Sequence, residues 1–190
     1  MQAAPQNLSL ETPDYENLKV YRDADGDALY VSMNVTPRPC FTWDLIRDFV
    51  SFQNRYVENL RRNTSPPRCV VYASESSGIF SLGGDLHLFK SASETQDRAM
   101  LTRYVGDCIN ALHNLLTTPE AVTVSLLEGD ALGAGLETAL ASDVIIAERG
   151  ARAGFPEVLF NLIPGLGGYY LAARRMGPRA AEKLIRDGAV

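Results

Sequence analysis

The sequence predicts an α/β fold, and two observations carry this prediction. Short apolar segments rich in β-branched residues, such as residues 69–74 and 121–129, alternate with segments whose apolar residues recur every three or four positions. Glycine and proline separate the two kinds of segment. This alternation is typical of buried sheets joined by helical crossovers. The pattern alone does not distinguish an open sheet from a spiral.

The first predicted elements are a β-hairpin and a long helix. Residues 18–33 alternate apolar and polar side chains on either side of an Asp-Gly turn, which predicts two paired strands. Thr42 is predicted to cap a helix that continues toward Leu60. The Pro-Pro pair at 66–67 prevents that helix from continuing.

The second half of the chain alternates strands and helices. The strand at 69–74 is continuously apolar, and a glycine turn follows it. The clearest helix covers residues 101–116, where apolar side chains recur at helical spacing, and Pro119 ends it. The elements predicted after it are a strand at 121–129, a short helix at 133–142, a strand at 143–148 and a helix from Tyr169 to Ile185.

The composition is that of one globular domain. The chain has 190 residues, of which 46% are hydrophobic and 22% charged, enough to bury a substantial core. The net charge of −5, with acidic and basic residues interspersed, argues against a nucleic-acid or anionic-membrane surface. No apolar run approaches the length of a membrane helix, so we expect no membrane partner.

The termini and the cysteines complete the domain prediction. Residues 1–17 are polar and predicted to be a flexible N-terminal segment without the pattern of a signal peptide, and residues 18–190 form the core domain. Cys40, Cys69 and Cys108 are odd in number and widely spaced, which favours reduced thiols and a cytoplasmic protein. No metal-ligand spacing is present, and we expect no metal.

A glutamate follows a Gly-Ala-Gly turn in the segment ALGAGLETALASDVII. The turn brings backbone N–H groups to the first turn of a helix, where they lack partners within the helix and can stabilise a negative oxygen. Glu137 lies three residues after Ala134, so an acid and these donors can share one pocket. Alternatively, Glu137 only complements the positive end of its own helix.

Two further segments combine glycines with an acid. GIFSLGGDL, residues 78–86, lets the backbone approach a ligand closely, although it is also a common loop. GFPEVLFNLIPGLGG, residues 154–168, places Glu157 after a proline, where the acid is either solvated or functional. Its glycine cluster lacks the spacing of a nucleotide-binding loop. His87 and His113 lack the Gly-x-Ser-x-Gly elbow of a serine hydrolase.

Together, the three segments resemble the crotonase (enoyl-CoA hydratase/isomerase) superfamily in order and spacing, with the second glutamate 20 residues after the first. Within it, PRPCFT, SLGGDLHLF, LEGDALGAGLE and FPEVLFNLIPGLGGYY are most similar to bacterial diffusible-signal-factor synthases, which make cis-2-unsaturated fatty-acid signals. The resemblance covers roughly residues 18–187.

The resemblance implies roles for eight residues. Glu137 and Glu157 would be the catalytic carboxylates, and the N–H groups of Gly84 and Ala134 would form an oxyanion hole. Many family members carry glycine at the position of Ala134, where a methyl group narrows the pocket without removing the N–H. The glycines expected to shape the substrate-binding pocket are Gly83, Gly133, Gly165 and Gly167.

The resemblance also implies an architecture. It is a crotonase-like spiral of ββα units, which assembles as a homotrimer when C-terminal helices are present. Those helices close the acyl site and support trimerisation in such families, and the sequence stops at LIRDGAV, where they would begin.

The implied activity is dehydration of a 3-hydroxyacyl thioester of acyl carrier protein to a cis-2-enoyl thioester, followed by hydrolysis to the free fatty acid. No cofactor is expected besides the carrier of the acyl group. Two alternatives stay open: an enoyl-CoA hydratase/isomerase that uses coenzyme A thioesters, and a non-catalytic domain that binds an acyl group or a regulatory protein. Basic residues at 174, 175, 183 and 186 either meet an acidic carrier or form a solvated helix face.

Overall fold

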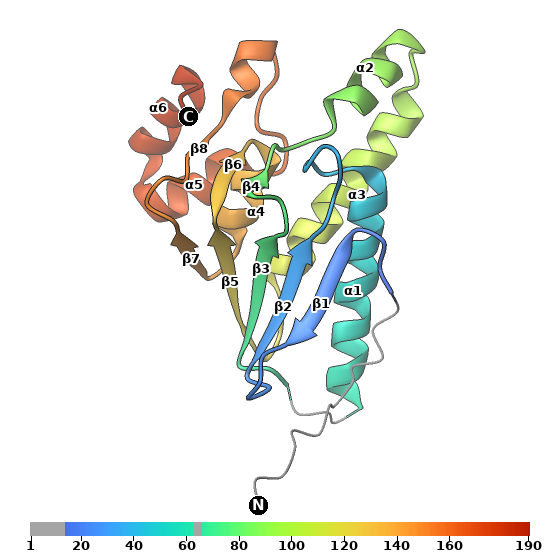
Figure 1. Ribbon diagram of the computed structural model, residues 1–190. Coiled ribbons are helices and arrows are strands. Elements are labelled where there is room, and N and C mark those ends of the chain that lie inside the picture. Colours follow the sequence, from blue (N-terminus) through green and yellow to red (C-terminus); the bar gives the residue numbers. More distant parts are fainter. Residues whose placement is uncertain (1–13, 63–65) are drawn as a thin grey trace, which may run out of the picture.

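The computed structural model describes residues 14–62 and 66–190, and its strands form two sheets (Figure 1). The larger sheet has the strand order β1-β2-β3-β5-β7, and the smaller one has the order β4-β6-β8. The strands are β1 (Leu18–Arg22), β2 (Ala28–Met33), β3 (Cys69–Ser74), β4 (Gly78–Ser81), β5 (Val122–Leu127), β6 (Gly129–Leu132), β7 (Val144–Ala147) and β8 (Ala153–Gly154).

The predicted hairpin is confirmed, since β1 and β2 pair antiparallel. The other pairings between these strands are parallel. The chain repeatedly enters the larger sheet, crosses to the smaller sheet and returns through helical structure, as in β3-β4, β5-β6 and β7-β8. This repetition gives the spiral of ββα units that the sequence resemblance implies.

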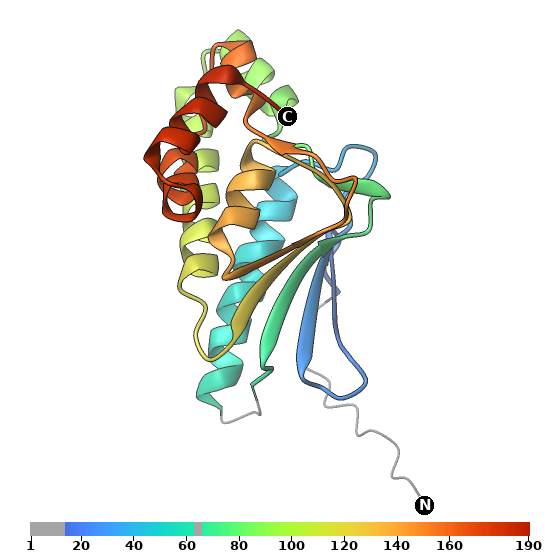
Figure 2. The ribbon, with the colours of Figure 1, turned by 90° about the vertical axis from the view of Figure 1, so that its left-hand side faces the viewer.

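Helices cover one side of the larger sheet, as Figures 1 and 2 show. Helices α1 and α3 pack against each other, and α4 packs against α5. The helices are α1 (Trp43–Arg61), α2 (Leu86–Glu94), α3 (Arg98–Leu116), α4 (Ala134–Ala141), the 3-10 helix η1 (Pro156–Phe160), α5 (Gly168–Met176) and α6 (Pro178–Asp187).

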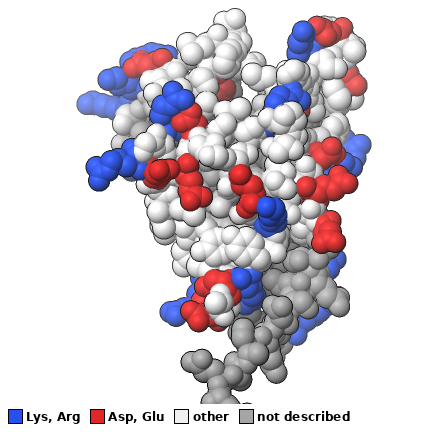
Figure 3. All heavy atoms as spheres, in the orientation of Figure 1, with Lys and Arg blue, Asp and Glu red and all other residues white. Residues whose placement is uncertain are grey.

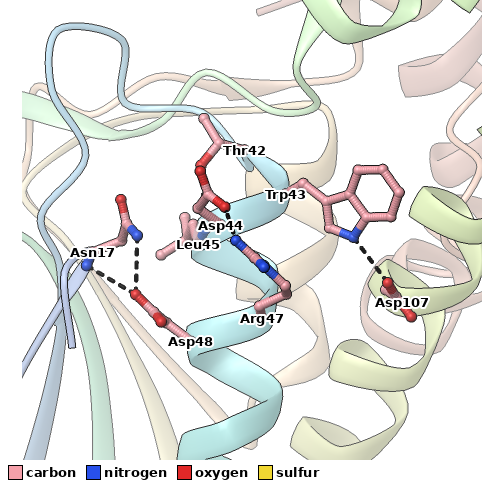
Figure 4. A network of polar contacts seen from close by, with 8 residues as sticks. All are labelled: Asn17, Thr42, Trp43, Asp44, Leu45, Arg47, Asp48 and Asp107. Atoms are coloured by element: carbon pink, nitrogen blue, oxygen red, sulfur yellow. Dashed lines mark hydrogen bonds and ion pairs between the residues drawn. The ribbon is translucent and has the colours of Figure 1, made fainter. Parts of the chain in front are cut away.

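The start of α1 is fixed to its surroundings by polar contacts (Figure 4). Thr42 caps the helix as predicted, because its hydroxyl accepts a hydrogen bond of 3.2 Å from the Leu45 N–H. The indole N–H of Trp43 donates to Asp107 on α3 at 3.0 Å. This contact joins α1 to α3 at the end of the molecule where the glycine loops lie.

Three sequence-based element predictions need correction. The strand predicted at 121–129 ends at Leu127, because the chain turns there into the second sheet as β6. The helix predicted from Tyr169 to Ile185 is two helices, since Gly177 and Pro178 break it. Helix α2 was not predicted, because its short sequence, LHLFKSASE, buries only Ala92.

The structure describes only part of the predicted flexible N-terminal segment, residues 1–17. Residues 1–13 of the predicted flexible segment lie outside the described residues. Asn17, also in that segment, donates from its backbone and side-chain nitrogens to Asp48 of α1 at 2.9 and 3.0 Å. No helix within residues 14–62 and 66–190 is both long and apolar enough to cross a bilayer.

Candidate active site

The carboxyl group of Glu137 is buried between α4 and α5. The side chain is 1% exposed. Its Oε1 atom accepts hydrogen bonds from the N–H groups of Leu166 at 2.8 Å and Gly168 at 2.7 Å. Gly168 is the first residue of α5. The carboxyl of Glu137 therefore caps α5, and Glu137 also lies in the first turn of its own helix, α4.

Burial and hydrogen bonding act on Glu137 in opposite directions. Desolvation raises its pKa, the N–H groups of Leu166 and Gly168 lower it, and the nearby charge of Glu157 raises it further. Burial dominates, and the pKa of Glu137 rises to about 7. Near neutral pH this carboxyl group is therefore suited both to hold a proton and to accept one.

Glu157 is the second acid of the site. It lies on η1, which follows β8, and its side chain is partly buried. A Cβ atom placed on Gly133 would lie only 2.4 Å from its Oε1 atom, so the carboxyl group packs directly against the turn that precedes α4. Burial raises its pKa as well. Its Oε2 atom is buried without a hydrogen-bond partner in the described part of the chain.

The two glycine turns lie side by side. A Cβ atom on Gly83 would stand 2.8 Å from the Leu132 carbonyl oxygen and 3.4 Å from the Ala134 nitrogen. Gly83 also has a φ of 91°, a backbone conformation that residues with a side chain rarely adopt. The turn after β4 therefore contacts the turn at the start of α4.

Both turns present backbone donors. Ala134 is the first residue of α4, so its N–H has no acceptor within the helix. Gly84 forms a parallel bridge with Phe41, whose N–H donates to the Gly83 carbonyl at 2.8 Å. In a parallel bridge of this kind, the backbone groups of the residues on either side of Gly84 point toward Phe41. The N–H group of Gly84 therefore points away from Phe41. The turns thus offer two N–H groups near the two acids.

Gly165 and Gly167, which were predicted to shape the pocket, lie in the segment that binds the Glu137 carboxyl. They alternate with Leu166 and Gly168, the two residues whose N–H groups bind Glu137. The glycine-rich segment GLGG therefore wraps the Glu137 carboxyl. Sequence reasoning missed Leu166 and Gly168 as donors, because it compared this cluster only with nucleotide-binding loops and with a pocket wall.

An apolar cavity of about 30 Å³ is lined by Thr138, which follows Glu137, and by Leu166, whose N–H binds Glu137. Gln53 and Tyr72 line the same cavity. A second cavity, of about 70 Å³, lies beyond the same Gln53 and Tyr72 side chains. Gln53 thus lines both cavities, and exposed residues such as Asn54 and Thr117 also line the second one.

The charged side chains of the last two helices have mixed roles. The Arg175 Nε atom donates to the Leu140 carbonyl at 3.1 Å, and its guanidinium also reaches the Ser142 carbonyl. Arg175 therefore closes the C-terminal end of α4. The Arg174 guanidinium stacks over the Tyr170 ring at 5.8 Å. On the face in Figure 3, basic and acidic side chains are interspersed.

The cysteines form no disulfide, as the sequence predicts. Cys40 and Cys108 are buried, whereas Cys69 is only partly buried. Burial raises the pKa of Cys108 to about 12, and the nearby charge of Glu137 contributes to this shift. Cys108 therefore lies near the site as a neutral thiol.

The fold, with two acids beside two glycine turns, is that of a crotonase-like protein. A model described as enoyl-CoA hydratase/isomerase matches residues 52–189, most of the chain. The chain belongs to the enoyl-CoA hydratase/isomerase family.

Two curated relatives illustrate the sequence similarity. The chain is 31% identical over 187 residues to the probable enoyl-CoA hydratase 2, mitochondrial, of Arabidopsis thaliana, which covers 96% of the chain and 58% of that protein. It is 30% identical over 146 residues to the human methylglutaconyl-CoA hydratase, mitochondrial. The matched region covers 77% of the chain and 41% of that protein. The chain thus spans roughly half the length of these relatives.

Solved structures share the fold. The structure of an enoyl-CoA hydratase from Bacillus anthracis aligns with a TM-score of 0.79 at 23% identity, covering 90% of the chain and 62% of that protein. The structure of Pseudomonas aeruginosa DspI aligns with a TM-score of 0.74 at 27% identity, covering 90% of the chain and 66% of DspI. These similarities confirm the predicted crotonase-like fold.

Proposed function

We propose that the protein is an acyl-thioester dehydratase of the diffusible-signal-factor synthase type. In this proposal it converts a 3-hydroxyacyl thioester of acyl carrier protein to a cis-2-enoyl thioester and then hydrolyses the thioester. The observation that carries the proposal is the placement of two acids with raised pKa values beside two turns that present backbone N–H groups.

The N–H groups of Gly84 and Ala134 would stabilise the substrate. Removing a proton from the α-carbon of a thioester moves negative charge onto the carbonyl oxygen, and two preorganised donors stabilise this charge. Each donor of this kind contributes roughly 10²–10³ in rate. Gly83 and Gly133 would hold the two turns close enough for both donors to reach one oxygen.

Glu137 and Glu157 would transfer the protons. One carboxylate takes the proton from the α-carbon, and the other, protonated acid gives a proton to the β-hydroxyl, which leaves as water. The pair then holds the same number of protons as at the start. Burial raises the pKa values of both acids, and the nearby charge of Glu157 raises that of Glu137 further.

Hydrolysis would use the same groups. A glutamate carboxylate accepts a proton from a water molecule as the water oxygen attacks the thioester carbonyl. The oxyanion of the tetrahedral intermediate then occupies the position of the earlier enolate oxygen. Cleavage of the carbon–sulfur bond releases the fatty acid and the carrier thiol, which takes up the proton.

The family supports a second candidate function, because both curated relatives described above carry names of CoA hydratases. A coenzyme A-dependent enoyl hydratase uses the same donors and acids in the reverse direction. It differs in its carrier and in releasing no free fatty acid. A non-catalytic acyl-binding domain is less favoured, since it gives no reason to bury Glu157 Oε2 without a partner among the described residues.

The test is a product analysis by mass spectrometry. The purified protein is given 3-hydroxyacyl chains of several lengths on acyl carrier protein and on coenzyme A. Free unsaturated acid formed faster from the carrier protein would support the synthase. An enoyl or 3-hydroxyacyl thioester in equilibrium, without free acid, would favour the hydratase. Binding without turnover of either carrier would contradict both enzymatic functions.

The homotrimer that the family resemblance implies when C-terminal helices are present remains a prediction. Large apolar side chains around η1 are exposed, including Leu159 at 68% and Ile163 at 78%. Such a patch is suited to burial in an assembly. Sedimentation or mass measurement of the protein in solution tests this prediction.

A further inference from the structure

Tyr104 on α3 lies directly behind the turn that carries Gly84. The side chain is 2% exposed. Its hydroxyl group donates a hydrogen bond to the Phe41 carbonyl oxygen at 2.5 Å. The hydroxyl oxygen of Tyr104 also accepts a bond from the Asp85 N–H at 3.3 Å. One phenol therefore both donates to the backbone and accepts from it.

These two partners lie on either side of the turn. The backbone of Phe41 binds one side of the turn, because its N–H donates to the Gly83 carbonyl at 2.8 Å. Asp85 directly follows Gly84 and precedes α2, where its carboxylate caps the His87 N–H at 3.0 Å. Tyr104 thus links Phe41, which pairs with the turn, to Asp85, where the chain leaves the turn.

The ring of Tyr104 contributes a second, apolar contact. It meets the Phe89 ring edge-on at a centroid distance of 5.6 Å and the Trp43 ring at 6.4 Å. A Cβ atom on Gly84 would lie 3.0 Å from the Phe89 ring. The Phe89 ring therefore lies against Gly84, and the Tyr104 ring packs on Phe89.

We infer that Tyr104 is a positioning residue for the oxyanion hole, acting through the Gly83–Gly84 turn rather than by contact with the substrate. This inference rests on the function proposed above. Its hydroxyl fixes both sides of the turn, and its ring supports Phe89 behind Gly84. The Gly84 N–H is thereby aimed at the same point as the Ala134 N–H.

The expected effect follows from the two hydrogen bonds that the substitution removes. In Tyr104→Phe the ring stays, while the Phe41 carbonyl and the Asp85 N–H no longer share the hydroxyl as a partner. A misplacement of about 1 Å in a reacting group costs roughly 10²-fold in rate. We therefore expect kcat to fall about 10- to 100-fold, with little change in KM, because the hydroxyl does not touch the acyl group.

Tyr56→Phe is the matched control. Tyr56 is also buried, and its hydroxyl donates to a backbone carbonyl, that of Pro119, at 3.0 Å. This contact lies beyond the C-terminal end of α3, where Tyr56 lines the second cavity. Both variants remove a buried hydrogen bond from a tyrosine to a carbonyl, but only Tyr104→Phe does so at the turn, where it also removes the bond from the Asp85 N–H.

The deciding measurement reports carbonyl polarisation directly. The absorption band of a conjugated aryl-enoyl thioester shifts to longer wavelength when its carbonyl is polarised. The band is recorded for the complex with Glu137→Gln, which prevents turnover, with and without each tyrosine substitution. We expect Tyr104→Phe to reduce the red shift and Tyr56→Phe to preserve it, while urea unfolding shows similar stability losses.

Phe89→Ala provides a second variant if Tyr104→Phe does not fold. Phe89 is only partly buried, and its removal should also reduce kcat and the red shift. An undiminished red shift and kcat in Tyr104→Phe, or in Phe89→Ala, would overturn the positioning role. Absence of turnover and of any red shift in the unmodified protein would instead contradict the proposed function, and the inference with it.

Discussion

Glu137 on α4 accepts a hydrogen bond of 2.7 Å from the N–H of Gly168 at the start of α5. The positive end of α5 favours the carboxylate form, and burial favours the neutral acid. Burial prevails, with a pKa of about 7. The balance leaves both protonation states accessible near neutral pH, which is the property that proton transfer to and from carbon requires.

Glu137→Gln should abolish most turnover while preserving the fold. The amide oxygen can still accept from Leu166 and Gly168, but the side chain can neither take nor give the proton. General acid–base groups contribute roughly 10²–10⁴ in rate, so a loss of that size is expected. Glu128→Gln is the control, because Glu128 is exposed and lies nine residues earlier. Steady-state rates of enoyl-thioester formation measure the effect, and equal rates for the two variants would remove Glu137 from the mechanism.

The raised pKa of Glu137 makes stability depend on pH. In the unfolded chain this group titrates near 4.5 and in the folded protein near 7. Between these values the folded state holds the proton more tightly, so the free energy of unfolding falls as pH rises. The contribution is complete below pH 4.5 and is lost as pH rises through about 7. Its slope is at most about 1.4 kcal/mol per pH unit.

Urea unfolding of wild-type protein and Glu137→Gln at several pH values from 5 to 7.5 isolates this contribution. Glutamine does not titrate, so the wild type should lose stability relative to the variant as pH rises. Parallel curves for the two proteins would contradict the assignment of a raised pKa to Glu137.

The sequence predicted the fold well where local signals agree with tertiary packing. The helix at 101–116 and the strand at 69–74 are single elements with one continuous pattern, and both are present. The strand at 121–129 was mispredicted at its end, because β5 and β6 are separated by Glu128 alone and no turn signal precedes it. Periodicity does not report which sheet a strand joins, so the division into two sheets followed only from family resemblance.

The site was predictable in its glutamates and glycine turns but not in its supporting contacts. Glu137 and Glu157 stand in recognisable motifs. The donors Leu166 and Gly168 bind through backbone N–H groups, which nearly every residue type possesses, so side-chain identity carries little information about them. Tyr104 had the same apolar spacing as its core neighbours on α3, and only the structure distinguishes its hydroxyl contacts from ordinary packing.

Gln53→Ala should extend the range of acyl chains that the protein accepts. The Gln53 side chain lies between the cavity lined by Thr138 and Leu166 and the second cavity, and its Nε2 atom donates to the Ala111 carbonyl at 2.9 Å. Removing it joins the two spaces, so longer chains should gain in kcat/KM relative to shorter ones. Asn114→Ala is the control, because it removes the donor to Gln53 Oε1 and leaves the Gln53 side chain in place. A chain-length profile that changes equally in both variants would speak against Gln53 as the boundary.

Gly83→Ala should separate the two turns whose N–H groups, those of Gly84 and Ala134, are proposed to form the oxyanion hole. Its Cβ would stand 2.8 Å from the Leu132 carbonyl oxygen, at a φ of 91° that alanine adopts only with strain. The turn must shift, and the loss of one aligned donor predicts a fall in kcat of roughly 10²–10³.

Gly106→Ala is the matched substitution. Gly106 lies within α3, and a Cβ there would meet no atom within 4 Å. Alanine is favoured over glycine in a helix by about 1 kcal/mol, so Gly106→Ala should raise the free energy of unfolding and leave kcat unchanged. The same glycine-to-alanine change is thus expected to stabilise one position and to inactivate the other. Unimpaired catalysis by Gly83→Ala would mean that contact between the two turns is not needed to align the donors.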